Sequence, residues 1–224
     1  MIKRYSRKEL TDIWSEENKY KIWLDVEVAA AEAMEKLGQI PRGVASIVRK
    51  KAVINVNRIH KIESEVKHDV IAFLTSVNEF VGDSGRYIHV GMTSSDVLDT
   101  GLSLQLKDSS ELLLKEIEKL ENEVRLLARK HKNTLMIGRF HASHGERISF
   151  GFKRAGSLAE IIRNKKRLLT LKESVAIGQI SGAMGTYANT NPKVEQITCD
   201  LLGLKPDTAS TQVISRDRHA CLSI

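Results

Sequence analysis

Histidine is the side chain best suited to proton transfer near neutral pH, and one of the seven histidines, His68, stands in a charged cluster. It lies in Lys67-His68-Asp69, where a cation, an imidazole and a carboxylate could together bind an anionic group. A helix beginning at Asp69 would add the positive end of its dipole to such a site. An ordinary capped helix start explains the same three residues equally well, so both interpretations remain open.

A second candidate site is the run of hydroxyl side chains in Thr93-Ser94-Ser95-Asp96, directly before a long helical pattern. Hydroxyl groups and free backbone N–H groups at a helix N-terminus form a pocket suited to an anion. Simple N-capping needs only one hydroxyl group. Three in a row after Gly91 therefore favour a binding role, with N-capping as the alternative.

A third candidate segment, Gly138–His144, lies between two long helical patterns and contains His141 and His144. The spacing of these two histidines is compatible with zinc ligation, but no suitable third ligand stands nearby, so we expect no metal site. Two further loops offer small or polar residues to a ligand, at 181–186 and 210–212.

These candidates lie at the ends of helices or between them, because apolar residues recur at three- and four-residue spacing over most of the chain. No proline lies between Pro41 and Pro192, which permits long helices. We expect a loop over 133–147 and no strand of useful length. The predicted fold class is therefore all-α, with helices at 6–14 (Ser6 and Glu9 forming a capping box), 16–37, 41–48, 57–65, 69–81, 94–132, 149–175 and 193–202.

Glycines interrupt the helical pattern between Gly82 and Met92, where residues 87–90 could form a short extended piece and where we expect a domain boundary. Residues 1–92 would then form an N-terminal helical domain, and residues 93–224 the first part of a long-helix bundle. Leucines spaced seven residues apart predict the seam of that bundle, and long helices that cannot bury such a seam alone indicate an oligomer. These leucines are Leu106, Leu113, Leu120 and Leu127.

The composition is typical of a globular protein, with 42% hydrophobic and 28% charged residues, and it excludes wholesale disorder. Two cysteines, Cys199 and Cys221, are too few for a disulfide framework, and no segment resembles a membrane span or a signal peptide, so we expect a cytoplasmic protein. The net charge of +7 indicates an anionic partner. Because aromatic residues make up only 5%, the basic cluster over 163–167 favours a solvated helix face, and RNA binding is the weaker alternative.

Taken together, five stretches resemble the fumarase/aspartase superfamily, and within it most closely the adenylosuccinate lyases. They follow the order and spacing of the family over nearly the whole chain. KHDV together with TSSD favours the adenylosuccinate lyases over the argininosuccinate lyases and the fumarases. The stretches are MIKRY (1–5), KHDVIAF (67–73), VGMTSSDVLDT (90–100), SGAMGTYAN (181–189) and TQVISRDRHA (211–220).

The resemblance implies an all-α, fumarase/aspartase-like fold and a β-elimination of fumarate from adenylosuccinate, giving AMP, and from the succinyl-carboxamide ribotide of purine nucleotide biosynthesis. The resemblance implies that the protein needs no cofactor or metal and binds neither nucleic acid nor a membrane. It also implies that the complete protein is a homotetramer with sites shared between subunits. A small anionic substrate that carries a phosphate and two carboxylates suits a basic site built from helix N-termini.

The resemblance also assigns roles to particular residues. The general acid that protonates the leaving nitrogen falls on His141, and His68 matches a histidine that helps this step. The substrate-binding positions of the family fall on Arg4, Tyr5, Lys67, His68, Asp69, His89, Thr93, Ser94 and Gln212.

The sequence GRFHASHGER around His141 departs from the family pattern G-R-T-H-G-x-H-A-x-P. Phe140 replaces a threonine, Ala142 and Gly145 exchange a glycine and an alanine, and Arg147 replaces a proline. Lys67 stands where arginine is common, which keeps the charge but loses bidentate geometry.

Members of the family are about twice as long as this chain, and their proton-abstracting serine is expected beyond Ile224. We therefore expect the 224-residue chain alone to be inactive. The alternatives are a non-catalytic helical oligomerisation or binding fragment, or another lyase of the superfamily with a changed substrate.

Overall fold

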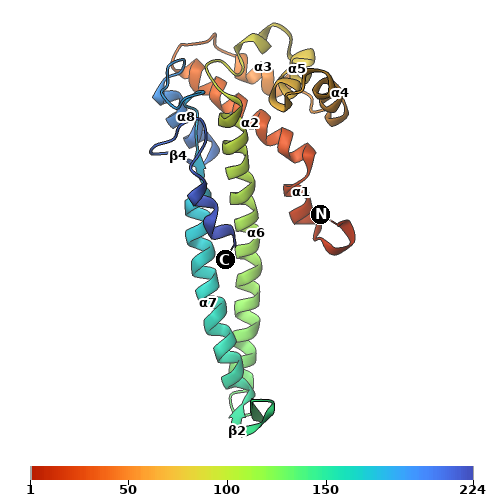
Figure 1. Ribbon diagram of the computed structural model, residues 1–224, viewed down its shortest axis with the longest axis vertical. Coiled ribbons are helices and arrows are strands. Elements are labelled where there is room, and N and C mark those ends of the chain that lie inside the picture. The colour runs from red at the N-terminus through yellow and green to blue at the C-terminus, as the bar shows by residue number, and fades with distance from the viewer. Residues whose placement is uncertain (1, 224) are drawn as a thin grey trace. The chain divides into compact units, whose positions relative to one another are not determined.

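The structure is a computed structural model that describes residues 2–223, and it divides into two compact units (Figure 1). Unit 1 comprises Met1–Asp108 and Ser174–Ile224, and unit 2 comprises Ser109–Glu173. The long helices α6 (Ser94–Lys130) and α7 (Phe150–Val175) run from one unit into the other. The fold is almost entirely helical, as predicted.

Unit 1 is a set of short and medium helices with one small pair of strands. β3 (Ile177–Gly178) pairs in parallel with β4 (Lys205–Pro206). The other elements are η1 (Lys3–Tyr5), α1 (Lys8–Ile13), α2 (Glu16–Lys36), α3 (Val44–Lys51), α4 (Val56–Val66), α5 (Asp69–Val81), η2 (Gly82–Tyr87), α8 (Pro192–Leu202) and η3 (Arg216–Ser223).

The core of unit 1 is built on three aromatic rings from α2 and α5. The ring centroids of Tyr20 and Trp23 lie 5.2 Å apart at an angle of 89°, and Phe73 lies 5.9 Å from Tyr20 in a stacked arrangement. Edge-to-face and offset-stacked rings contribute beyond the apolar area they bury. Because Tyr20, Trp23 and Phe73 are all buried, this cluster fixes α5, and the residues just before it, against α2.

Most predicted helix boundaries are confirmed to within one turn, because capping residues mark them. The side chain of Ser15 accepts from the N–H of Asn18 at the start of α2, and Asn191 caps α8, whose first residue is Pro192. The predicted capping box is wrong. The hydroxyl of Ser6 donates instead to the carbonyl of Ile2 (3.0 Å), and α1 begins after Arg7 with no side-chain cap.

Two further expectations are corrected in unit 1. The helix predicted from Pro41 begins only at Val44, because Gly43 precedes it with φ +91°. Residues 87–90, predicted as a short extended piece, form the end of η2 and a turn. The boundary predicted at residue 92 concerns the domains of the complete fold and stays a prediction.

Unit 2 contains a β-hairpin where a loop was predicted over 133–147. β1 (Leu135–Phe140) pairs antiparallel with β2 (Ser143–Ser149), and only His141 and Ala142 lie between them. Both have positive φ, 48° and 62°, which is the geometry of a two-residue type I′ turn. The hairpin is largely exposed, and its turn lacks the Asn-Gly pair that signals this type, so the sequence pattern did not predict it.

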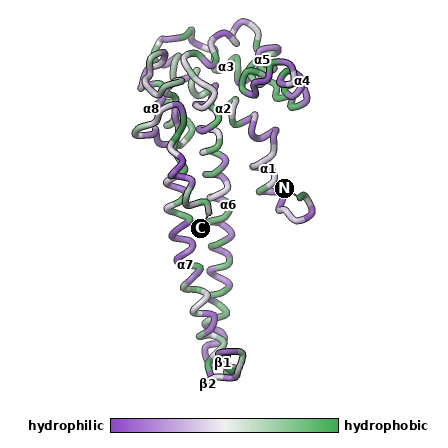
Figure 2. The backbone as a smooth tube through the Cα atoms, in the orientation of Figure 1, coloured by the Kyte–Doolittle hydropathy of each residue, from purple (hydrophilic) through white to green (hydrophobic). Residues whose placement is uncertain are grey.

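The α6 and α7 segments of unit 2 are joined by ion pairs. Lys165 lies 3.1 Å from Glu118 and 3.3 Å from Glu121, and Lys172 lies 2.9 Å from Glu111. Hydrophobic and hydrophilic positions alternate along both helices (Figure 2). The predicted seam leucines of this unit remain partly open to solvent: Leu113 is 48% exposed, Leu120 50% and Leu127 39%.

All of the net charge lies in unit 2. Residues 109–173 carry 15 Lys and Arg against 8 Asp and Glu, a net +7, whereas unit 1 carries 20 of each. The charge excess is therefore a property of the helical hairpin and its turn.

Two further observations concern the hydropathy of the helices and the state of the cysteines. Among the helices of residues 2–223, none combines the length and the apolar character that crossing a membrane requires. Cys199 is a buried free thiol whose pKa is raised to about 12 by burial, and the side chain of Cys221 lies outside the described residues.

The aromatic cluster predicts a sharp contrast between two phenylalanines of α5. Phe73→Ala should lower the free energy of unfolding by about 3–5 kcal/mol, because it removes a fully buried ring. Phe80→Ala, on the same helix but 43% exposed, should cost about 1 kcal/mol or less. Urea unfolding of both variants measures the difference, and equal losses would contradict the assigned core.

Candidate functional site

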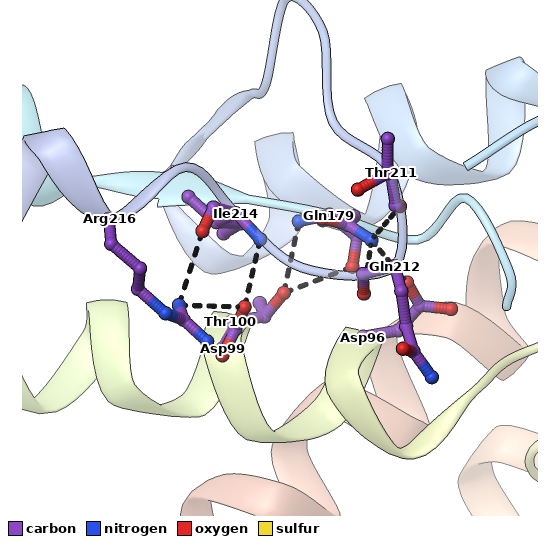
Figure 3. A network of polar contacts seen from close by, with 8 residues as sticks. All are labelled: Asp96, Asp99, Thr100, Gln179, Thr211, Gln212, Ile214 and Arg216. Carbon is purple, nitrogen blue, oxygen red and sulfur yellow. Dashed lines mark hydrogen bonds and ion pairs between the residues drawn. The ribbon is translucent and has the colours of Figure 1, made fainter. Parts of the chain in front are cut away.

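The start of α6 is held by the buried carboxylate of Asp96 (Figure 3). Its Oδ2 accepts from the backbone N–H of Thr93 and of Gly182, both at 3.0 Å. Its Oδ1 accepts from the N–H of Ser181 and from Nε2 of Gln179, both at 3.2 Å. Burial raises the pKa of Asp96 above its usual value, while these donors act in the opposite direction.

Gln179 extends this network to the segment that contains Gln212. Its Nε2 also donates to the carbonyls of Thr211 and Gln212, each at 3.1 Å, and its backbone exchanges two 3.0 Å hydrogen bonds with the hydroxyl of Thr100. One turn along α6, buried Asp99 accepts from the N–H of Ile214 at 2.8 Å and pairs with Arg216 (Figure 3). Two segments distant in sequence, 179–182 and 211–216, thus converge on the first two turns of α6.

Backbone contact brings two of the loops of this site against each other. Gly91 has φ +70°, and a Cβ atom built on it would lie 2.0 Å from the carbonyl oxygen of Asn189. Only glycine therefore permits the turn before Thr93 to lie against the 181–189 loop. The loop over 181–186 takes part in this contact, since a Cβ atom built on Gly182 would lie 3.2 Å from the carbonyl oxygen of Gly91, while its predicted approach to a ligand stays a prediction.

His68 lies between the starts of α5 and α6. Its Nδ1 accepts from the N–H of Ile71 at 3.4 Å as the N-cap of α5, and its Nε2 lies 3.4 Å from the hydroxyl of Ser94. Nδ1 also lies 3.5 Å from a carboxylate oxygen of Asp69. The imidazole is about half exposed. The same ring caps α5 and reaches the start of α6, which confirms the cap interpretation, while anion binding by Lys67-His68-Asp69 stays a prediction.

The remaining unit 1 candidates are less tightly held. Lys67 is exposed, and it ends α4 with φ 57°. At the N-terminus, the guanidinium of Arg4 lies 4.7 Å from the ring centroid of Tyr5, and Tyr5 is 75% exposed. Long, exposed side chains of this kind are free to adjust to a ligand.

His89 lies in a turn before α6 and contacts a carboxylate that sequence reasoning missed. Glu27, in the middle of α2, is 1% exposed, and its two oxygens lie 2.9 Å from the backbone N and 2.6 Å from Nδ1 of His89. Burial lowers the pKa of His89, but the hydrogen bond and charge of Glu27, with the charge of Asp96, outweigh it and raise the pKa above the usual histidine value.

His141 is exposed at the turn of the unit 2 hairpin. Its ring centroid lies 4.5 Å from that of Phe140, which stands where the family pattern has threonine. The left-handed backbone of His141 and Ala142 turns the chain back on itself within these two residues. A positive φ strains the backbone of residues other than glycine, and strained backbone is often found at functional sites.

The structure therefore brings several sequence-predicted residues together in unit 1. His68 contacts Ser94 and Asp69, and Thr93 is connected to Gln212 through Asp96 and Gln179. His141 belongs to unit 2. Sequence reasoning missed Glu27 and Gln179, although a glutamate inside the apolar run of α2 is itself a signal.

Among the described residues, no group of three or more His, Cys, Asp or Glu side chains is arranged to hold a metal ion. The site consists instead of two helix starts, hydroxyl groups and imidazoles. Such groups are suited to binding anions and to transferring protons.

Comparison with known proteins gives consistent results. A family model described as lyase matches residues 3–224. The chain is 57% identical to adenylosuccinate lyase of Synechocystis sp. over 220 residues, which make up 98% of this chain and 51% of that protein. It is 48% identical to adenylosuccinate lyase of Aquifex aeolicus, over 99% of this chain and 52% of that protein. The chain thus spans about half the length of these relatives.

Solved structures of similar shape are also known. The crystal structure of fumarate lyase from Mesorhizobium sp. BNC1 matches with a TM-score of 0.88 and 27% identity, covering 96% of this chain and 53% of that chain. The 3-carboxy-cis,cis-muconate lactonizing enzyme from Pseudomonas putida matches with a TM-score of 0.88 and 24% identity, over 98% of this chain and 52% of that chain, which supports the fold.

The Asp96 network predicts a large effect from a small substitution. Asp96→Asn places an N–H₂ group against backbone donors, and each buried donor left unpaired costs about 1–3 kcal/mol. The variant should therefore unfold at clearly lower urea concentration than the wild type. Asp83→Asn, a substitution at a fully exposed carboxylate, should leave the unfolding curve unchanged, and an equally small effect of Asp96→Asn would refute the role of the buried carboxylate.

The hairpin turn predicts that a glycine is preferred at position 142. Ala142→Gly should stabilise the hairpin by about 1 kcal/mol, because the second residue of a type I′ turn needs positive φ. Slower amide hydrogen exchange along β1 and β2 would show this. Ala159→Gly, within α7 and exposed, should act in the opposite direction by about 1 kcal/mol, and the same sign for both variants would contradict the turn assignment.

Proposed function

The chain belongs to the lyase family whose model it matches, and on that premise we propose that it is the N-terminal portion of an adenylosuccinate lyase. The complete enzyme would release fumarate from adenylosuccinate, giving AMP, and from succinyl-carboxamide ribotide in purine nucleotide biosynthesis. It would act in the cytoplasm and bind no nucleic acid.

The observation that carries this proposal is the position of His68, Thr93 and Ser94 at the starts of α5 and α6. Each helix start offers backbone N–H groups and a partial positive charge to an anion. The imidazole that caps α5 reaches the hydroxyl of Ser94 on α6, so one bound anionic group would contact both helix starts. A substrate with a phosphate and two carboxylates suits this arrangement.

In the proposed elimination, a base removes the proton from Cβ of the succinyl group. The electron pair of that C–H bond forms the double bond of fumarate, the C–N bond breaks, and the leaving nitrogen takes up a proton. His141 in its protonated form would donate that proton, with His68 assisting. The base, a serine in the family, is not among the residues assigned in this chain, so we expect the 224-residue chain alone to form no fumarate.

Two observations support the anionic substrate and the shared site. The unit that carries His141 holds the entire net charge of +7, and a positive field of this kind attracts anions. The exposed leucines of α6 form an apolar stripe of the kind that helices bury against other helices. We propose that the complete protein is a homotetramer in which the partner's His141 serves the site of unit 1.

The assignment of the general acid is tested in the complete protein encoded by the same gene. His141→Ala should lower kcat for adenylosuccinate by about 10²–10⁴-fold, since a positioned acid contributes this much. Fumarate formation, followed by its ultraviolet absorbance, gives the rate. His60→Ala provides the matched control, because His60 is exposed and pairs with Glu16 at 3.0 Å.

Three outcomes of these measurements would contradict the proposal or favour one of its alternatives. A kcat of His141→Ala within a few-fold of the wild type would refute the acid assignment. If the complete protein consumes argininosuccinate or another succinyl compound but not adenylosuccinate, the chain belongs to a lyase of changed substrate. Fumarate formation by the purified 224-residue chain would overturn the expected inactivity of this portion.

A further inference from the structure

The backbone of His89 is held in a conformation that histidine does not readily adopt. Its φ is +62°, in the left-handed region that is uncommon for residues other than glycine. Such conformations persist only where the surroundings impose them. The contact that imposes this one comes from α2, which is distant in sequence.

Glu27 contacts His89 with both carboxylate oxygens. Oε2 accepts from the backbone N–H of His89 at 2.9 Å, and Oε1 lies 2.6 Å from Nδ1. Glu27 is 1% exposed and lies among the buried residues of α2, so its carboxylate has left water for these two contacts. A buried charge of this kind is costly unless it is paired and hydrogen-bonded.

The carboxylate determines which ring nitrogen of His89 carries a proton. An ionised carboxylate only accepts hydrogen bonds, so the short contact to Oε1 requires a proton on Nδ1. Nε2 is then the nitrogen that remains for a ligand. The charged groups that act on the ring are Glu27 from α2 and Asp96 from α6, both negative, and both favour a protonated imidazole.

We propose that Glu27 is a positioning residue: it holds His89 in its left-handed turn with a proton on Nδ1, so that a second proton on Nε2 gives an imidazolium whose Nε2–H donates to an anionic group of the substrate. This inference rests on the proposed function only in placing His89 at the substrate. The two contacts of Glu27 with His89, called the clamp below, lie within unit 1 and are tested without a measurement of enzyme activity.

The isosteric variant Glu27→Gln gives a sharp test. A glutamine can keep both contacts only if its carbonyl oxygen accepts from the backbone N–H and its amide N–H₂ donates to Nδ1. The neutral ring would then carry its proton on Nε2, so the tautomer reverses while the size of the side chain is unchanged.

The tautomer is measured by NMR of ¹⁵N-histidine-labelled chain across a pH titration, with His89 assigned from the spectrum of His89→Gln. In the wild type we expect Nδ1 protonated and the pKa of His89 above the ordinary histidine value. In Glu27→Gln the proton should move to Nε2, and the pKa of His89 should fall. Glu16→Gln, which removes a carboxylate that contacts His60, should leave the tautomer and the pKa of His89 unchanged.

The wild-type spectrum by itself already tests the clamp. A neutral His89 ring protonated on Nε2 would overturn the proposal even if Glu27→Gln failed to fold. An unchanged tautomer and pKa in a folded Glu27→Gln variant would overturn it as well.

The effect on substrate is measured in the complete protein. Glu27→Gln should raise KM for adenylosuccinate roughly tenfold or more, with a smaller change in kcat, since a hydrogen bond to a charged group is weakened. Glu16→Gln should leave both constants unchanged. If the tautomer reverses in Glu27→Gln but KM is unchanged, the role of Nε2 at the substrate is overturned. If the complete wild-type protein is inactive, the proposed function is refuted, and the NMR measurement alone then decides whether Glu27 positions His89.

Discussion

The buried carboxylate of Asp96 is the interaction on which the arrangement of unit 1 depends. A carboxylate without access to water must be satisfied by donors, and here the donors come from the start of its own helix, from the 181–182 backbone and from Gln179. Through Gln179 the same carboxylate also reaches the 211–212 carbonyls. Loops with little apolar surface of their own are thereby fixed to the first turn of α6.

The histidines of the candidate site differ in how firmly they are held. His89 is clamped by a buried carboxylate, His68 is held by longer contacts at two helix starts, and His141 is exposed on a two-residue turn. This gradation fits the roles proposed for them. A group that only binds benefits from a fixed position, whereas a group that delivers a proton must also reach the substrate.

The sequence predicted those parts of the fold that local patterns determine. The periodicity of α5, α6 and α8 placed these helices to within a few residues, and the resemblance of KHDV and TSSD assigned His68 and Ser94 to one substrate site, a role that stays a prediction. The hairpin was missed because its turn is His-Ala, which carries no local signal for positive φ. Glu27 stands out as a glutamate inside an apolar run, but its contact was missed because its partner, His89, is distant in sequence.

The two-residue turn between β1 and β2 has a consequence for how sequences of this kind tolerate change. Along a β-ribbon, side chains alternate between the two faces, so a residue inserted into or deleted from β1 or β2 would change the direction of His141 unless a bulge absorbs it, as the irregularity between Ile137 and Arg139 does here. Substitutions at Phe140 or Ala142 alter packing or strain but leave that direction intact. The length of this turn is therefore a stricter requirement for the proton-donor role proposed for His141 than the identity of its neighbours.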